Sequence, residues 1–316
     1  MKILLTTIAV LVFVAHIAAQ EVSIRKKTLN DTLAPALPRT IENLDANTLK
    51  VLFIGNSYTH TNDLPGMLQK AASSMGLKFT SVSATPGGWH WMWHAVDSNT
   101  IAAIKKDKYD IVVLQEFSQA LSLPDSTVEK ESIPYLNQLV DTITKYNPQA
   151  KLALYETWGR RDGDMHNGEF WAPVRTYMGM DSLLEQRYRT LSKQIGATMI
   201  PVGLVWRQIR ATYPDIELYS PDGSHPSLLG TYAGAMTFLS MFYNLDARQI
   251  AYYDKVNGEL ATKILDAVET VKSNEEHIRQ LELPVVVEES DLEMPVDEPF
   301  IEKDKIDNRR KRKRKI

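Results

Sequence analysis

The chain has 316 residues, a formal net charge of −3 and no cysteine. Its length and its 44% hydrophobic content suffice for one large domain, and the lack of cysteine excludes disulfides, thiolate nucleophiles and cysteine metal sites. Because seven consecutive basic residues, Arg309 to Lys315, offset part of the acidic charge elsewhere, the body of the chain is clearly acidic and we expect no binding of nucleic acid.

The first 19 residues have the three-part layout of a secretory signal peptide. The basic residue Lys2 is followed by the apolar run Ile3 to Val14 and then by small residues. This run is short for a bilayer span, so we expect cleavage and no stable membrane insertion afterwards; an uncleaved anchor is the alternative. The sequence therefore predicts a secreted or periplasmic protein. Residues 20–48 mix charge with proline and are expected to form a lead-in.

From residue 49 to residue 283, short apolar segments alternate with amphipathic ones, which predicts a single domain. The predicted strands are residues 50–54, 78–84, 111–114, 152–155 and 198–202. The predicted helices are residues 64–75, 128–145, 181–195, 226–243 and 258–283. Such alternation implies parallel strands and right-handed crossovers, so the predicted fold is α/β: a flavodoxin-like three-layer α/β/α sandwich with a five-stranded parallel sheet. Residues 284–316 are charged and patternless, which predicts a disordered tail.

The first predicted strand ends in a glycine, and Ser57 follows two residues later. Ligands of open α/β sheets bind at the carboxyl ends of the strands, so Ser57 occupies a usual position for an active-site residue. A serine hydroxyl needs a base, and the segment 222–225, Asp-Gly-Ser-His, offers a carboxylate and an imidazole three positions apart. We therefore predict a triad of Ser57 as nucleophile, His225 as base and Asp222 as the orienting acid. Pro226 suits the first position of a helix, which would place His225 at a helix start.

Attack on an ester also requires hydrogen-bond donors for the oxyanion. The backbone N–H of Ser57 is one candidate, and that of Gly88, after the second predicted strand, is another. Two glutamines follow the third predicted strand, and the side-chain amide of either Gln115 or Gln119 could supply a third donor. Both glutamines remain candidates at this point.

These segments resemble the SGNH, or GDSL-like, hydrolase superfamily. In that family a Gly-Asp-Ser block follows strand one, a glycine follows strand two, a Gly-x-Asn-Asp block follows strand three, and Asp-x-x-His lies near the C-terminus. Here residues 55–57 read Gly-Asn-Ser, Gly88 fits the glycine and residues 222–225 fit the last block. The resemblance covers residues 50–243 and implies a serine ester hydrolase. The third block is missing, and counting along the strand puts Gln119 at its asparagine position.

Several side chains near the predicted strand ends could contact a substrate. Trp89, Trp91 and Trp93 alternate along the chain, so an extended backbone would gather their indoles into a platform for a sugar ring; packing in the core is the alternative. The loop after the fourth predicted strand carries Trp158 and Arg160, and Arg160 could bind a carboxylate or sulfate unless the loop is merely solvated. The histidines and carboxylates lack metal-ligand spacing, so we expect no metal and no cofactor.

The sequence therefore predicts a monomeric, secreted serine esterase whose partner is an acylated carbohydrate, with acetyl as the expected acyl group. Three alternatives remain. They are a non-catalytic carbohydrate-binding protein on the same scaffold, a lipase or thioesterase of the same family, and phosphodiester or sulfate-ester chemistry led by Arg160. The basic run near the C-terminus is expected to be solvated.

Overall fold

The computed structural model describes residue 41, residues 48–253 and residues 255–273. Its centre is a five-stranded parallel sheet with the order β2-β1-β3-β4-β5. The strands are β1 (Thr48–Ile54), β2 (Lys78–Ala84), β3 (Ile111–Leu114), β4 (Lys151–Tyr155) and β5 (Thr198–Ile200). This order is that of a flavodoxin-like sheet, so the predicted α/β fold class is confirmed.

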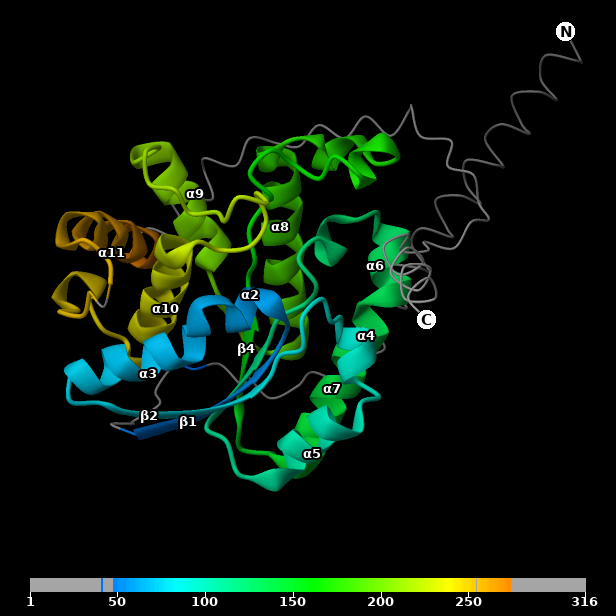
Figure 1. Cartoon of the computed structure of the whole chain (residues 1–316). Coiled ribbons are helices and arrows are strands. Elements are labelled where there is room, and N and C mark those ends of the chain that lie inside the picture. The colour runs from blue at the N-terminus through cyan, green and yellow to red at the C-terminus, as the bar shows by residue number, and fades with distance from the viewer. Residues whose placement is uncertain (1–40, 42–47, 254, 274–316) are drawn as a thin grey trace, which may run out of the picture. The chain divides into compact units, whose positions relative to one another are not determined.

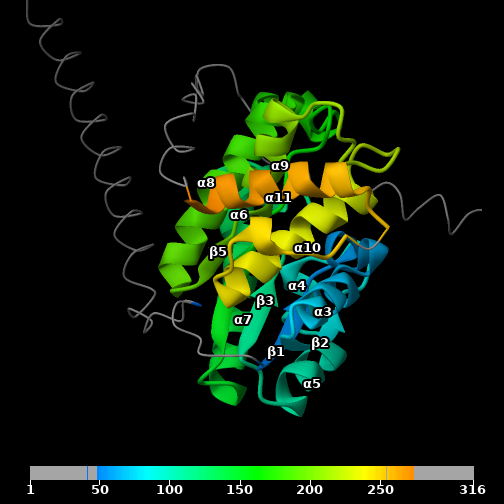
Figure 2. The same ribbon diagram turned by 90° about the vertical axis from the view of Figure 1, so that its left-hand side faces the viewer.

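Helices cover both faces of the sheet, which makes three layers (Figures 1 and 2). The first face carries α3 (Leu64–Ser74), α9 (Val202–Thr212), α10 (Leu228–Tyr243) and α11 (Gly258–Ser273). The second face carries α4 (Trp91–His94), α5 (Ser98–Lys106), α6 (Asp125–Glu131), α7 (Ile133–Tyr146) and α8 (Tyr177–Ile195). Because successive side chains of a strand point to opposite faces, Val51 and Phe53 enter the first core while Leu52 and Ile54 enter the second.

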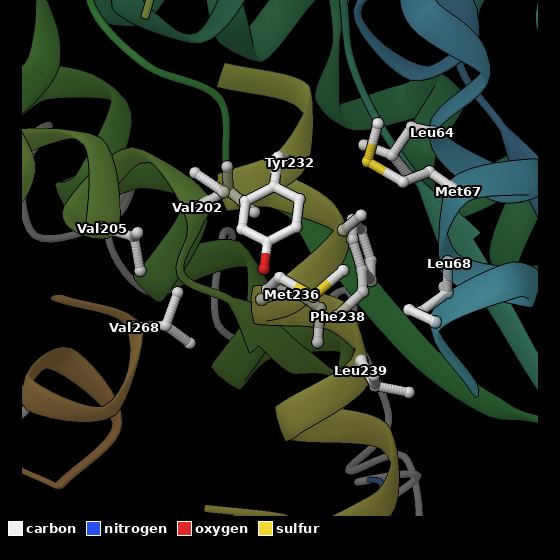
Figure 3. Close-up of a cluster of buried hydrophobic side chains, with 14 of the residues drawn as sticks. Leu64, Met67, Leu68, Val202, Val205, Tyr232, Met236, Phe238, Leu239 and Val268 are labelled. Carbon is white, nitrogen blue, oxygen red and sulfur yellow. The ribbon is translucent and has the colours of Figure 1, made fainter. Parts of the chain in front are cut away.

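The first core is built around α10, which is apolar on nearly its whole circumference. Tyr232, Met236 and Phe238 are fully buried there, with α3, α9 and α11 packed around them (Figure 3). A helix that is hydrophobic all round is stable only when surrounded, and each such buried side chain contributes about 1.5–3 kcal/mol. This packing holds α10 firmly, and α10 directly follows the predicted Asp-x-x-His segment.

Proline accounts for two differences between the predicted and observed elements. The helix predicted at residues 128–145 is divided at Ser132 into α6 and α7, and Pro134 lies in the first turn of α7, where its missing N–H costs no hydrogen bond. The fifth strand ends at Ile200 rather than at residue 202. Pro201 is followed at once by α9, so the chain turns from strand to helix there.

Some sequence predictions fall outside the described residues. These are the signal peptide at residues 1–19, the lead-in apart from residues 41 and 48, the end of the helix predicted at residues 258–283, and the tail at residues 284–316. The described part of α11 ends at Ser273. Among the helices of the described ranges, none has the length and apolar character needed to cross a membrane.

Candidate active site

Ser57, His225 and Asp222 form one chain of hydrogen bonds. Ser57 Oγ lies 2.8 Å from His225 Nε2, and His225 Nδ1 lies 2.6 Å from Asp222 Oδ2. Burial by itself would raise the pKa of the Asp222 carboxyl, but hydrogen bonds from His225 and Ser224 outweigh it and hold that pKa below its usual value. Asp222 is therefore an anion that takes the Nδ1–H of His225 and leaves Nε2 to accept the proton of Ser57.

The acid and the base share one tight turn. Asp222 Oδ1 accepts the backbone N–H groups of Ser224 and His225, each at 2.9 Å. Gly223 has a φ of +68°, in the left-handed region that glycine enters without strain. The carbonyl of His225 accepts the N–H of Ser220 at 2.8 Å, which closes the turn. These local bonds fix His225 relative to Asp222 without help from distant residues.

Pro226 does not start a helix, so the prediction that His225 stands at a helix start is wrong. Helix α10 begins two residues later at Leu228, and the side chain of Ser227 caps it by accepting the N–H of Gly230 at 3.1 Å. Serine is among the favoured N-cap residues, because its oxygen satisfies a helix N–H that would otherwise lack an acceptor. Pro226 pairs instead with Tyr219 in an isolated antiparallel bridge.

The nucleophile lies in a turn between β1 and the short helix α2 (Ser57–His60). Asn56 Oδ1 caps this helix by accepting the N–H of Tyr58 at 3.1 Å. A Cβ atom at Gly55 would lie 2.7 Å from Gln115 Oε1, so the turn has room only for glycine there. The N–H of Ser57 lies in the first turn of α2 and has no intrahelical acceptor.

Tyr58 links the nucleophile turn to the base. Its ring stacks on Trp158 with the centroids 4.6 Å apart, and it meets the ring of His225 edge-on at 5.6 Å. The Tyr58 hydroxyl lies 2.7 Å from Ser224 Oγ, and Trp158 Nε1 donates to the carbonyl of Ser224 at 3.0 Å. Trp158 is fully buried, so the substrate contact predicted for it is wrong. It supports Tyr58 and the turn of His225 from within the core.

The loop after β2 brings Gly88 beside the nucleophile turn. The carbonyl of Trp89 accepts Asn56 Nδ2 at 2.9 Å, and His60 Nδ1 lies 2.6 Å from the carbonyl oxygen of Thr85. Gly88 has a φ of +72°, which again suits glycine. Its backbone N–H meets no acceptor in the described part of the chain, so it is open to a bound molecule.

Gln115 belongs to the framework of the nucleophile turn. It is fully buried, and its Oε1 accepts the N–H of Asn56 at 3.0 Å and the hydroxyl of Thr59 at 2.9 Å. Its Nε2 donates to the carbonyl of Glu116. The role of oxyanion donor predicted for Gln115 therefore does not hold, because both ends of its amide are engaged inside the protein.

Gln119 is in a different position. It is partly exposed, and its Oε1 accepts Arg160 Nη2 at 2.9 Å and the hydroxyl of Ser118 at 2.5 Å. Its Nε2 has no acceptor among the described residues. Of the two glutamines, Gln119 is the one whose amide N–H groups remain open to a substrate.

The tryptophans after Gly88 do not form a flat platform. Trp91 begins the helical turn α4 and is fully buried in the second core, so the substrate role predicted for it is wrong. Trp89 and Trp93 remain partly exposed, with their rings edge-on and the centroids 6.3 Å apart. The extended backbone needed to align all three indoles is replaced here by a turn of helix.

Arg160 does not present an open fork to solvent. Its Nη2 donates to Gln119 Oε1, and its Nη1 lies 3.3 Å from the carboxylate of the fully buried Asp164. Its Nε is buried and has no hydrogen-bond partner within the described chain. Both terminal nitrogens are thus held by protein groups, which does not support the predicted bidentate binding of a substrate anion.

Glu116, two residues after the end of β3, connects two loops of the site. In the structure its Oε1 accepts the N–H groups of Phe117 at 2.7 Å and Trp91 at 3.1 Å, and it lies 3.6 Å from His90 Nδ1. Burial raises the pKa of Glu116 to about 8 despite these hydrogen bonds. The side chain therefore joins the loop after β2 to the loop after β3, largely as a neutral acid. The available sequence signal was a carboxylate directly after a buried strand.

Histidines near the site hold backbone carbonyls. His94 is fully buried, with Nε2 placed 2.8 Å from the carbonyl oxygen of Gly55, and His60 holds Thr85 in the same way. Within the ranges described, no group of three or more histidine, aspartate or glutamate side chains is arranged to hold a metal ion. These imidazoles therefore position the turns on either side of Ser57.

The sequence matches no protein-family model and no curated protein. Solved structures do resemble this one. A DUF4886 family protein from Bacteroides uniformis has a TM-score of 0.62 at 18% sequence identity, over 72% of this chain and 96% of that chain. A proposed SGNH hydrolase from Slackia heliotrinireducens has a TM-score of 0.50 at 24% identity, over 61% of this chain and 98% of that chain.

This chain has the SGNH hydrolase fold. Two segments that resemble the family blocks follow the first two strands, residues 55–57 after β1 and Gly88 after β2. Gln119, at the place of the missing third block, follows β3. Ile54 is paired with Ala84 of β2 and with Leu114 of β3, so these three strands end together. Parallel pairing thus gathers the segments at one edge of the sheet, where the turn of residues 222–225 meets them through Ser57.

Proposed function

We propose that the protein is a serine ester hydrolase. The observation that carries this proposal is the hydrogen-bonded line from Ser57 Oγ through both nitrogens of His225 to Asp222. Ser57 and His225 are 168 positions apart in the chain, so a local turn preference cannot explain their contact. The SGNH hydrolase fold, shared with a proposed SGNH hydrolase, supports the same chemistry by analogy.

The proposed reaction has two halves. Ser57 Oγ attacks the acyl carbonyl carbon while His225 Nε2 takes its proton, and the imidazolium is stabilised by the anionic Asp222. The collapsing tetrahedral intermediate breaks the bond to the alcohol oxygen, which receives the proton from His225. Water then attacks the acyl-serine with His225 again as base, and the carboxylic acid and Ser57 are released.

Three donors would hold the oxyanion in both halves. They are the backbone N–H groups of Ser57 and Gly88 and the side-chain N–H of Gln119. None of these three groups has a protein acceptor among the described residues, and this supports the set. The amide of Gln115, by contrast, is hydrogen-bonded inside the protein through both its oxygen and its nitrogen. Donors that are already in place when negative charge develops need no reorganisation, and this makes them effective.

We propose an acetylated carbohydrate as the substrate class. The partly exposed indoles of Trp89 and Trp93, beside Gly88, are suited to stacking on a sugar ring. Trp91 and Trp158 are both buried and are therefore not available to stack on a sugar ring. We also propose that residues 1–19 are removed on export and that the monomer acts outside the cytoplasm, which N-terminal sequencing and sizing of the exported protein would test.

A second candidate substrate class is an ester or thioester with a longer acyl chain. The segment between β4 and α8 and the first turn of α8 expose three large apolar side chains, Met165, Phe170 and Met178, at 70%, 50% and 41% of their surface. This segment also carries Arg160, which reaches Gln119. Exposed apolar side chains on a segment that reaches the site are suited to contacting a hydrocarbon chain.

Covalent labelling with a fluorophosphonate, together with hydrolysis of p-nitrophenyl acetate, tests the chemistry. We expect the wild-type protein to be labelled and active, and Ser57→Ala to lose labelling. Ser57→Ala and His225→Ala should each lower kcat by about 10⁴-fold or more, because the triad acts as a unit. Ser83→Ala, a change of an exposed serine in β2, is the matched control and should behave as wild type. Undiminished hydrolysis by Ser57→Ala would overturn the proposal, and absent labelling with retained sugar binding would favour a non-catalytic binding protein.

A substrate panel separates the two substrate classes. Acetate release from acetylated polysaccharides, weakened by Trp89→Ala but not by Phe170→Ala, is the expected result for a carbohydrate esterase. A preference for p-nitrophenyl esters that increases with acyl length and is lost in Phe170→Ala would instead establish the second class.

A further inference from the structure

Hydrogen bonds restrain Gln119 at its backbone carbonyl and at its side-chain oxygen. Its backbone carbonyl accepts both the N–H and the hydroxyl of Ser122, at 2.9 Å and 2.8 Å. Its amide oxygen accepts Arg160 Nη2 at 2.9 Å and the hydroxyl of Ser118 at 2.5 Å. Hydrogen bonds thus hold both the backbone and the amide oxygen of Gln119. Only its N–H₂ group is without a partner in the described chain.

Arg160 fixes the orientation of the Gln119 side-chain amide, that is, whether its oxygen or its nitrogen faces the guanidinium. A guanidinium carries five N–H donors and no acceptor, so the amide atom that faces it must be the oxygen. Because the amide is planar, the N–H₂ group of Gln119 is then directed away from Arg160. The hydroxyl of Ser118 cannot fix the orientation in this way, because it could either donate to the amide oxygen or accept from the N–H₂ group. Without Arg160, both orientations of the amide become available.

The Gln119 amide lies in the electrostatic neighbourhood of the triad. Burial raises the pKa of the Tyr58 hydroxyl, while Ser224, Arg160 and Ser118 each lower it in part. The two groups that hold the oxygen of Gln119 thus both influence the hydroxyl of Tyr58, whose ring meets His225 edge-on.

Arg160 connects the loop after β4 with the loop after β3, and protein contacts hold it in place. Its Nη1 lies 3.3 Å from the carboxylate of Asp164, which is fully buried and also accepts the N–H and the side-chain amide of Asn167. The backbone N–H of Arg160 meets Met180 Sδ at 3.3 Å. The loop after β4 thus carries a fixed cation that reaches the loop after β3 and ends on Gln119.

We propose that Arg160 is a positioning residue for the oxyanion hole: it holds the oxygen of Gln119 so that the amide N–H₂ group is presented to the oxyanion. This inference rests on the proposed ester hydrolysis. It gives Arg160 a role without any contact to the substrate. It also gives a physical reason why a glutamine could serve here in place of the family's Gly-x-Asn-Asp block.

A double-mutant cycle with Arg160→Met and Gln119→Ala tests the inference, with kcat and KM measured on p-nitrophenyl acetate. Loss of one oxyanion donor lowers kcat by about 100-fold, which we expect for Gln119→Ala with KM little changed. We expect Arg160→Met to lower kcat by about 10-fold, and to add no further loss when Gln119 is already alanine. Arg160→Lys should recover part of the activity, because an ammonium is also a donor without acceptors. Arg248→Met, at an exposed ion pair elsewhere, is the matched control for loss of one positive charge.

Additive losses in the cycle would overturn the inference, since Arg160 would then act on the substrate or the oxyanion directly. A loss in Arg160→Met that appears only as a higher KM would overturn it in the same way. If Arg160→Met does not fold, Arg160→Lys completes the cycle with the same criterion, a partial loss that vanishes in the Gln119→Ala background. Gln119→Glu keeps the acceptor for Arg160 but lacks the N–H₂ group, so it should keep its melting temperature and lose kcat. Ser57→Ala is measured alongside: its continued activity would refute the proposed function, whereas an inactive Ser57→Ala with an additive cycle refutes only the role of Arg160.

Discussion

The side-chain oxygen of Gln115 accepts the backbone N–H of Asn56 at 3.0 Å, which ties the end of β3 to the turn that carries the nucleophile. The two residues lie 59 positions apart in the chain. Since both are buried, this hydrogen bond is shielded from water and holds the approach to Ser57 in one geometry. The nucleophile is therefore positioned by a neighbouring strand as well as by its own.

Gln115→Leu should destabilise the protein. It leaves the buried N–H of Asn56 and the hydroxyl of Thr59 without their acceptor, which costs about 1–3 kcal/mol for a buried polar group. Urea unfolding measures the loss, and kcat on p-nitrophenyl acetate should fall with it because Ser57 is less well held. Gln69→Leu, at an exposed glutamine, is the control and should unfold as wild type does. Equal midpoints for the two variants would contradict the role given to Gln115.

Gly55→Ala tests how closely the same contact is packed. The added Cβ would lie 2.7 Å from both Gln115 Oε1 and Thr59 Oγ1, so the turn must move. Overpacking of this kind costs about 1–3 kcal/mol, and we expect a lower melting temperature together with a loss of kcat. Gly258→Ala is the control, because a Cβ there meets nothing within 4 Å. A Gly55→Ala variant as stable and as active as the control would show that the turn adapts freely.

Tyr58→Phe separates the two contacts of that side chain. The variant keeps the stacking on Trp158 and the edge-on contact with His225, and it loses the hydroxyl with its hydrogen bond to Ser224. A neutral hydrogen bond is worth about 0.5–1.5 kcal/mol, so we expect a small loss of stability and a kcat within about 10-fold of wild type. Tyr58→Ala, which removes the ring, should lose far more of both. Tyr253→Phe, at an exposed tyrosine, is the control for the hydroxyl alone.

Glu116→Gln should change how stability depends on pH. Burial raises the pKa of Glu116 to about 8 from an ordinary value of 4.5, so the native state keeps a proton that the unfolded chain releases between these values. The wild-type protein therefore loses stability as pH rises through this window, on the order of 5 kcal/mol from this group. Glutamine does not titrate and can still accept the N–H groups of Trp91 and Phe117.

Urea unfolding at pH 5 and pH 8.5 measures that difference. The stability of Glu116→Gln relative to wild type should increase from the lower to the higher pH. Glu129→Gln, at an exposed glutamate, controls for removal of a carboxylate and should show no such trend. A constant difference between Glu116→Gln and wild type at both pH values would mean that Glu116 is ionised in the folded protein throughout.

The strands were the most predictable part of the fold. Segments such as residues 111–114 are short, wholly apolar and bounded by polar residues, because a parallel strand covered by helices is buried on both faces. The predicted ends of the strand at residues 78–84 agree with the structure as well. Helix ends were less certain, since Pro226 and Ser227 both suit a helix start and only Ser227 makes the capping hydrogen bond.

The glutamines show where local pattern is insufficient. Gln115 and Gln119 carry the same amide four positions apart, yet one is turned inward by Asn56 and the other is held at the surface by Arg160. Their partners lie 59 and 41 positions away, so no nearby residue distinguishes the two. Trp158 is a similar case, because its burial depends on Tyr58 and on the turn of Ser224.

The order of strands and helices, and the choice of Ser57, Asp222 and His225 as candidates, could be read from the chain because they depend on short-range periodicity and on chemical type. Which amide keeps an open N–H₂ group, which indoles are buried and what holds Arg160 came from the folded arrangement alone. These properties depend on contacts between residues far apart in the chain, and hydrogen bonding and packing act over a few ångströms in space whatever the separation in sequence.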